Sequence, residues 1–305
     1  MQRNLLDYLI IALKGMAMGA ADVVPGVSGG TIAFISGIYE ELIHSINAVN
    51  LQTLKGFPKN GFAATWKAIN GNFLLALFTG IAISVVSLAK LIKWLLLNEP
   101  VLLWSFFFGL VLASILFVGK EIKRWDAAVV LTFIAGAALA YYITTLPPMQ
   151  NTGSTAFLFL AGALAICAMI LPGISGAFIL VLLGAYETIL GAVNERNIQV
   201  IAIVGAGAVF GLLSFARLLK YLFNNFKNLT LALLTGFIFG SLNKIWPWKE
   251  VTETRVIGEK VITISEQSVW PGSFSEDPQT LMALLMAVVG FALIIGLERL
   301  ATQKN

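Results

Sequence analysis

A glycine-rich segment that interrupts an apolar stretch occurs twice in this 305-residue chain. The first copy reads PGVSGGT at residues 25–31, and the second reads PGISGAF at residues 172–178. Each copy continues to a Gly-x-Tyr-Glu sequence, at 37–40 and 184–187, with a constant offset of 147 residues (172 − 25 = 147). Eight of the sixteen aligned positions are identical, where chance gives about one. Because proline lacks an amide hydrogen and clashes with the preceding turn, the sequence predicts two related halves, each with a broken helix.

The composition is that of a membrane protein. The chain is 58% apolar and 12% charged, with a mean hydropathy of +0.87, whereas soluble proteins carry about 25% charged residues. Six apolar stretches have about the length that spans a bilayer: residues 73–97, 101–118, 127–146, 198–223, 229–245 and 279–297. The net charge of +4 comes from basic residues beside these stretches, where they signal orientation in the membrane and not nucleic-acid binding. We therefore expect an all-α polytopic membrane protein.

The repeat extends past the glycine-rich segment. Gly80 and residues 87–94 recur as Gly207 and residues 214–221, at an offset of 127. The first half therefore has about twenty extra residues (147 − 127 = 20) within 46–72. Gly109 and Gly236 share this offset (236 − 109 = 127), and a third pair, Gly136 and Gly290, makes the spans 127–146 and 279–297 equivalents. Residues 1–150 then form a first repeat with a hairpin at 5–46, and residues 151–305 a second with a hairpin at 155–193, each followed by three of the six spans.

Charge gives these halves a direction. Residues 47–72 carry three lysines and no acid, and residues 120–126 carry three basic residues, which predicts a cytoplasmic position for both. The loop 246–278, with six acids against three bases, is expected outside, with a short β-hairpin at 255–264. Both termini are then cytoplasmic. Three net crossings per half make the second half inverted relative to the first, whether each hairpin is re-entrant or crosses fully.

The two motifs are the leading candidates for a ligand site. A helix that restarts after each break has amides without intrahelical partners and the positive end of a dipole, which suits an anion. The candidate phosphate-binding residues are Ser28, Gly29, Gly30, Thr31, Ser175 and Gly176, after breaks at Pro25, Gly26, Pro172 and Gly173. Alternatively, the glycines only permit close packing of helices.

Five charged residues complete the candidate site. Lys90 and Arg217 are counterparts in the repeat and are expected to contact an anionic head group, or to snorkel at the interfaces. Glu40 and Glu187 are expected three to four turns into the second arm of each hairpin, as carboxylates that couple transport to protons or pair with a cation. Asp22 is a third such carboxylate, and its counterpart is Met169.

Residues 14–31, KGMAMGAADVVPGVSGGT, followed by Gly-Ile-Tyr-Glu at 37–40, resemble the signature of the bacterial polyprenyl-phosphate (undecaprenyl-phosphate) translocase family. The resemblance covers essentially the whole chain. It implies an integral protein of the bacterial cytoplasmic membrane that returns the lipid carrier of cell-wall synthesis across the bilayer. The second copy has Ala177 and Phe178 where the first has Gly30 and Thr31, so the two hairpins need not contact the phosphate equally.

Several functions remain in competition. The leading one is an alternating-access flippase for polyprenyl phosphate, coupled to protons. The alternative is a channel or exchanger for a small inorganic anion, because paired half-helices serve that purpose too. An enzyme is not expected, since no nucleophile with a nearby base is evident, and a pure assembly factor would leave the duplicated motif unexplained. No nucleotide-binding motif is present, and no cofactor is expected; the oligomeric state and the coupling ion stay open.

Overall fold

The computed structural model describes residues 3–23, 27–149, 154–257 and 260–302. It is mostly helical, as predicted, with one β-hairpin added. The helices of the first half are α1 (Leu5–Val23), α2 (Gly29–Ile35), α3 (Tyr39–Ala48), α4 (Leu51–Ala68), α5 (Gly71–Asn98), α6 (Pro100–Glu121) and α7 (Ala127–Thr145). The second half contains α8 (Thr155–Ile170), α9 (Gly176–Leu182), α10 (Tyr186–Asn194), α11 (Ile198–Asn225), α12 (Lys227–Ser241), η1 (Leu242–Ile245), β1 (Lys249–Ile257), β2 (Lys260–Ser268), η2 (Pro271–Ser273) and α13 (Thr280–Thr302).

Four pairs of long helices form the body of the molecule. Helix α1 packs along α5, α8 along α11, α6 along α13, and α7 along α12. Glycines allow these close crossings: a Cβ on Gly80 would collide with the carbonyl of Ala12, and one on Gly207 with the carbonyl of Phe159. The apolar core between the helices includes the fully buried Phe73. Small residues at helix crossings are typical of membrane bundles.

Within the described residues, four helices are long and apolar enough to cross a membrane. They are the apolar part of α5 (Gly71–Leu88), α6, α7 and α11, with α9 and α10 as a fifth candidate if that pair, bent by 113°, is one span. The six predicted spans are therefore confirmed only in part. Helix α12 has 15 residues and rises only about 22 Å, while the apolar part of α13, Thr280–Gly296, is a shorter apolar helix.

Each predicted hairpin is broken twice. The first break separates α1 from α2 and α8 from α9, as the motif predicts. A second break follows at Gly37 and Gly184, whose φ angles of 72° and 66° end α2 and α9 after seven residues each. Glu40 and Glu187 consequently lie in the first turn of α3 and α10. Their expected place several turns into a second arm was wrong, because positive φ at glycine restarts the helix.

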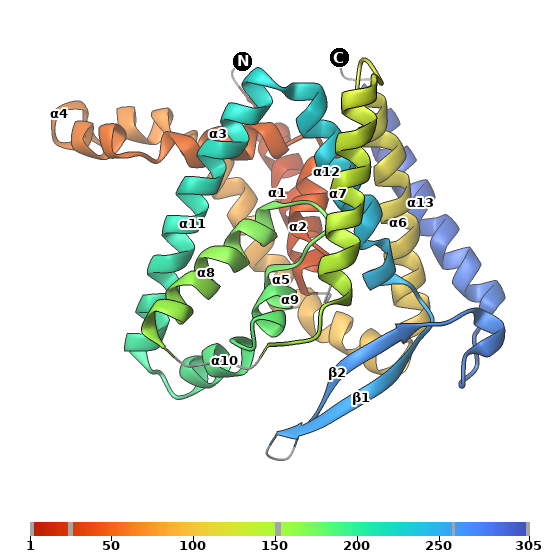
Figure 1. Ribbon diagram of the computed structural model, residues 1–305. Helices are drawn as coiled ribbons and strands as arrows, with labels where there is room; N and C mark the ends of the chain where they lie inside the picture. The colour runs from red at the N-terminus through yellow and green to blue at the C-terminus, as the bar shows by residue number, and fades with distance from the viewer. Residues whose placement is uncertain (1–2, 24–26, 150–153, 258–259, 303–305) are drawn as a thin grey trace.

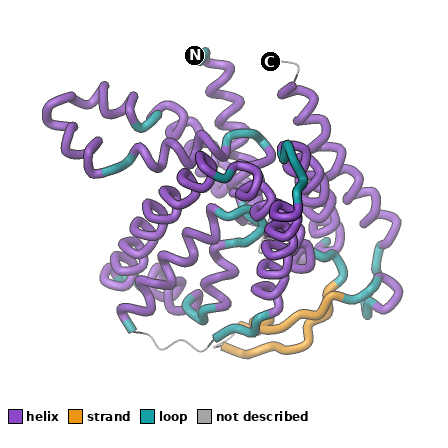
Figure 2. Tube along the Cα trace, turned by 45° about the horizontal axis from the view of Figure 1, so that its top comes forward, coloured by secondary structure: helices purple, strands orange, loops and turns teal. Residues whose placement is uncertain are grey.

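The peripheral elements lie at opposite ends of the bundle. Helix α4, which accounts for the extra residues of the first half, projects sideways from one end, and the antiparallel pair β1–β2 lies at the other (Figures 1 and 2). The two strands include the β-hairpin predicted at 255–264 and extend beyond it at both ends. Residues 258–259 lie outside the described residues. Helix α1 begins and α13 ends at the α4 end (Figure 1).

Candidate functional site

The two motif copies meet in the interior. The Ser28 hydroxyl caps α2 by accepting from the amide of Gly30 at 3.1 Å, and it donates to the carbonyl of Met169 at 3.1 Å. The Thr31 hydroxyl oxygen accepts from the amide of Gly173 at 2.9 Å. Ser28 and Thr31 are each 1% exposed. The start of α2 is therefore joined, by buried hydrogen bonds, to the break between α8 and α9.

The first amide of α2 binds an internal carboxylate. The Gly29 amide donates to Asp22 Oδ1 at 2.7 Å, so Asp22 occupies the helix terminus at which an anion was predicted. A Cβ on Gly29 would meet this carboxylate, and one on Gly30 would meet the carbonyl of Ile170 at 2.6 Å. The glycines thus serve close packing and leave the helix terminus open to a negatively charged group.

The second copy is built differently. Ser175 precedes α9 without capping it through its side chain, and it is 6% exposed. A Cβ on Gly176 would meet the carbonyl of Ala165 at 2.6 Å. Met169 stands where the first copy has Asp22, so this start has no corresponding carboxylate.

The helix breaks are described in part. Pro25 and Gly26 lie outside the described residues. Pro172 and Gly173 lie between α8 and α9, and a Cβ on Gly173 would meet Ser241 Oγ of α12 at 2.8 Å. The break in the second half therefore packs against α12 with no room for a side chain.

Arg217 lines a separate polar pocket at the α4 end. The pocket has a volume of about 510 Å³, within the range typical of ligand sites. Its lining consists of polar and basic residues from α3, α4 and α11: Asn47, Asn50, Gln52, Arg217, Lys220, Tyr221, Asn224 and Asn225. The side-chain amide of Asn47 donates to the carbonyl of Ala216 at 2.7 Å and holds α3 against α11. With two cations and no acid among its lining residues, this pocket suits an anion.

An apolar groove of about 820 Å³ lies between α8 and α11. Its walls include Phe159 and Leu160 of α8 and Ile203 of α11. Such a surface suits a hydrocarbon chain.

The remaining predicted residues are dispersed. Lys90 is exposed on α5 and is absent from the lining of the Arg217 pocket. Glu40 accepts a hydrogen bond from Lys227 Nζ at 2.7 Å, and the two side chains are 48% and 52% exposed. Glu187 is exposed in α10. The structure thus brings together the motif residues and Asp22, and leaves Lys90, Arg217, Glu40 and Glu187 apart from them.

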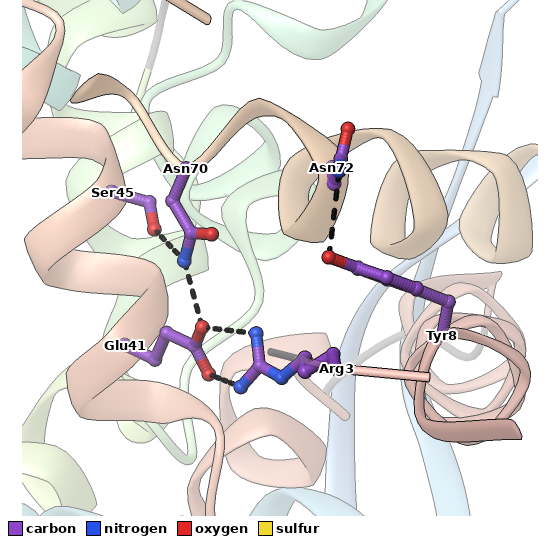
Figure 3. Close-up of polar contacts among 6 residues, drawn as sticks. All are labelled: Arg3, Tyr8, Glu41, Ser45, Asn70 and Asn72. Atoms are coloured by element: carbon purple, nitrogen blue, oxygen red, sulfur yellow. Dashed lines mark hydrogen bonds and ion pairs between the residues drawn. The ribbon is translucent and has the colours of Figure 1, made fainter. Parts of the chain in front are cut away.

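Sequence reasoning missed a polar network around Glu41. Arg3 donates two hydrogen bonds to the Glu41 carboxylate, at 2.6 and 2.7 Å, and the Asn70 amide donates a third at 2.7 Å and a weaker one to Ser45 (Figure 3). The network joins the segment before α1, the first turns of α3 and the residue before α5. The repeat gave no signal for it, because the counterpart of Glu41 is Thr188.

Within the described part of the chain, no group of three or more His, Cys, Asp or Glu residues is arranged to hold a metal ion. The polar groups described above are hydrogen-bonding side chains, cations and carboxylates.

Comparison with known proteins agrees with this chemistry and with the resemblance noted above. The family described as undecaprenyl phosphate translocase-like matches residues 18–261. The chain is 46% identical, over 304 residues and 98% of each chain, to the polyprenyl-phosphate transporter of Vibrio cholerae. It is 32% identical to the polyprenyl-phosphate transporter of Staphylococcus aureus over 258 residues, which are 77% of this chain and 85% of that protein. No solved structure matches the chain. The chain therefore belongs to the undecaprenyl phosphate translocase-like family.

Proposed function

We propose that this protein moves polyprenyl phosphate, and undecaprenyl phosphate in particular, between the leaflets of the bacterial cytoplasmic membrane. The observation that carries the proposal is the buried junction of the two motif copies, in which a helix terminus holds the carboxylate of Asp22. Like that carboxylate, a compact anionic head group is negatively charged and accepts hydrogen bonds from backbone amides. The names of the two relatives, both polyprenyl-phosphate transporters, favour this lipid over a small inorganic anion.

The inverted repeat is part of the proposal. Several close glycine crossings recur at equivalent positions of the repeat: Gly15 with Leu77 corresponds to Gly162 with Val204, and Gly109 with Ala287 corresponds to Gly236 with Phe133. Exchanging the halves therefore turns the α6–α13 pair into the α12–α7 pair. This equivalence supports two halves related by a two-fold axis, an arrangement in which one half can move against the other around a central site.

The head group follows a polar route and the tail stays in lipid. The pocket around Arg217 and Lys220 receives the phosphate at the cytoplasmic end, since these cations form charge-assisted hydrogen bonds with phosphate oxygens. At the motif junction the phosphate replaces Asp22 on the amide of Gly29, with Ser28, Gly30, Thr31, Ser175 and Gly176 around it. The apolar groove between α8 and α11 accommodates part of the chain, and Lys90 attracts the head group at the opposite face.

Proton coupling is assigned to the carboxylates. The Glu40–Lys227 ion pair links α3 of the first half to α12 of the second, so protonation of Glu40 releases a contact between halves. Glu187 is its counterpart in the repeat, and Asp22 changes partner when phosphate arrives. Return of the carrier to the cytoplasmic face, for reuse in surface-polymer synthesis, is the physiological direction that we propose.

The test is movement of undecaprenyl phosphate in proteoliposomes with and without a pH gradient. Arg217→Ala and Ser28→Ala are compared with Lys59→Ala, which changes an exposed lysine of α4. We expect gradient-sensitive movement that is reduced at least tenfold by the first two substitutions and unchanged by the third. Absence of lipid movement by folded wild-type protein, together with phosphate or chloride flux in the same vesicles, would support the anion channel instead.

A further inference from the structure

Two lysines share one carboxylate at the β-hairpin end. Lys244 lies in η1, directly after α12, Lys249 is the first residue of β1, and Glu266 belongs to β2. The Glu266 Oε2 atom is 3.5 Å from Lys244 Nζ and 3.6 Å from Lys249 Nζ. Nothing in the repeat predicted this cluster, because the counterpart of Lys244 is Phe117.

The Glu266 carboxylate is too far from both ammonium groups to form short hydrogen bonds with them. Charge-assisted hydrogen bonds to carboxylates are about 2.7–2.9 Å long, as in the 2.7 Å contact of Lys227 with Glu40. Lys249 Nζ makes one short hydrogen bond, to the carbonyl of Lys244 at 2.8 Å. Two ammonium groups against one carboxylate leave a net positive charge and unfilled donors.

Neighbouring acids have other partners. The Glu250 carboxylate accepts from the amide of Ser275 at 3.0 Å, and Glu99 accepts from the side chain of Gln279 at 3.4 Å. Among the side chains that the structure describes, Glu266 is the carboxylate that pairs with these lysines, so their excess positive charge is available to an incoming anion.

An aromatic ring lies against each cation. Lys249 Nζ lies 4.1 Å from the centre of the Trp104 ring, and Lys244 Nζ lies 5.0 Å from that of Phe178. The Lys249 side chain is only 10% exposed and that of Lys244 is 26% exposed. Burial lowers the pKa of Lys249 to about 8, opposed by Glu266 and reinforced by Lys244. Electrostatic attraction is stronger in such surroundings than in bulk water.

The cluster adjoins the second motif. Phe178 is the last residue of that motif copy, and Gly173 of the same copy packs against Ser241, three residues before Lys244. The lysine pair lies at the β-hairpin end, whereas the Arg217 pocket lies beside α3 and α4 at the other (Figure 1). Tryptophans such as Trp246 and Trp270, which contact one another, are typical of a membrane interface.

We propose that Lys244 and Lys249 bind the phosphate head group of the lipid at the β-hairpin end, and that Glu266 occupies this site until the head group arrives. The inference rests on the proposed function and adds to it a further phosphate site that has no counterpart in the repeat. A phosphomonoester offers three oxygens, enough to give both ammonium groups short hydrogen bonds. Arrival of phosphate releases Glu266 and with it the contact of β2 with the lysine pair.

The experiment measures binding of farnesyl phosphate to purified protein by calorimetry. Because this ligand also fits the motif junction and the Arg217 pocket, all variants carry Arg217→Ala and Ser28→Ala as a common background. Lys244→Met with Lys249→Met is expected to weaken binding at least tenfold, while Lys59→Met on α4 leaves it unchanged. Glu266→Gln is expected to strengthen binding severalfold, because it removes the competing anion but keeps the shape. A merely structural role for the three residues would not give opposite signs.

Two further ligands identify what is recognised. Farnesol is expected to bind equally to the background protein and to the double lysine variant, since it has no charge for them to recognise. Inorganic phosphate is expected to bind more weakly than farnesyl phosphate but to lose affinity in the same variant. Equal affinity for inorganic and farnesyl phosphate would overturn the assignment to lipid.

The site and the proposed function fail separately. Unchanged affinity in the double lysine variant, or weaker binding in Glu266→Gln, would overturn the site even if wild-type protein moves undecaprenyl phosphate. Should the double lysine variant not fold, Glu266→Gln still decides the question. Lipid that does not move while the lysine-dependent binding persists would overturn the function and leave the site.

Discussion

At the scale of single residues, some glycines are needed because another backbone lies against them, and others are not. Gly207 and Gly205 lie on the same helix, α11, but only Gly207 faces another backbone, that of Phe159. Gly207→Ala is expected to destabilise the protein by about 1–3 kcal/mol, because the added methyl overpacks the crossing. Gly205→Ala is the matched control, since a Cβ there meets no atom within 4 Å. Thermal unfolding in detergent measures both, and equal losses for the two variants would contradict the close crossing.

Lys249 gives the fold a dependence on pH. Burial lowers its pKa from 10.5 to about 8, so between these values the unfolded chain binds more protons than the folded one. The free energy of unfolding is therefore expected to rise with pH through this window, by up to about 3 kcal/mol. Unfolding of wild type and of Lys249→Met from pH 7.5 to 10.5 tests this. The free energy of unfolding is expected to rise in wild type and not in Lys249→Met. An equal rise in the variant would show that Lys249 is not the cause.

At the scale of elements, the contact between the two motifs is the feature that transport depends on. Thr31→Val removes the acceptor of the Gly173 amide and leaves that buried donor unpaired, at a cost of about 1–3 kcal/mol. Thr235→Val is a suitable control, because its equally buried hydroxyl donates only within α12, to Leu231. We expect the first variant to lose stability and lipid movement and the second to retain both. Identical behaviour of the two would show that the junction contributes nothing.

The elements also show what sequence can and cannot predict. The breaks after α1 and α8 were predictable, because proline and glycine act locally. The second breaks at Gly37 and Gly184 were missed. Glycine adopts negative and positive φ about equally readily, so its presence in the sequence does not tell which one the fold uses. The sequence predicts Asp22 as a coupling carboxylate, but its hydrogen bond with the Gly29 amide joins two helices and is evident only in the folded structure. The pairing of Lys244 and Lys249 with Glu266 depends on the register of β1 and β2, which no local pattern encodes.

At the scale of the whole molecule, the proposed inversion makes equivalent residues face opposite sides of the membrane. Asn98 and Asn225 are counterparts at the offset of 127, and each side-chain amide donates at 2.8 Å to the carbonyl four residues earlier, in Trp94 and Tyr221. In a chain whose only cysteine, Cys167, is replaced by alanine, Asn98→Cys is expected to react with an impermeant maleimide in intact cells. Asn225→Cys is expected to react only after permeabilisation. Labelling of both from one side would contradict the inverted repeat.

The account as a whole depends on movement of a lipid phosphate through a junction of two related halves. Its most direct test is the rate at which undecaprenyl phosphate exchanges between the leaflets of vesicles that contain the purified wild-type protein, compared with protein-free vesicles. We predict rapid exchange of the lipid with no accompanying flux of inorganic phosphate. Exchange no faster than in protein-free vesicles, from protein shown to be folded, would contradict the account.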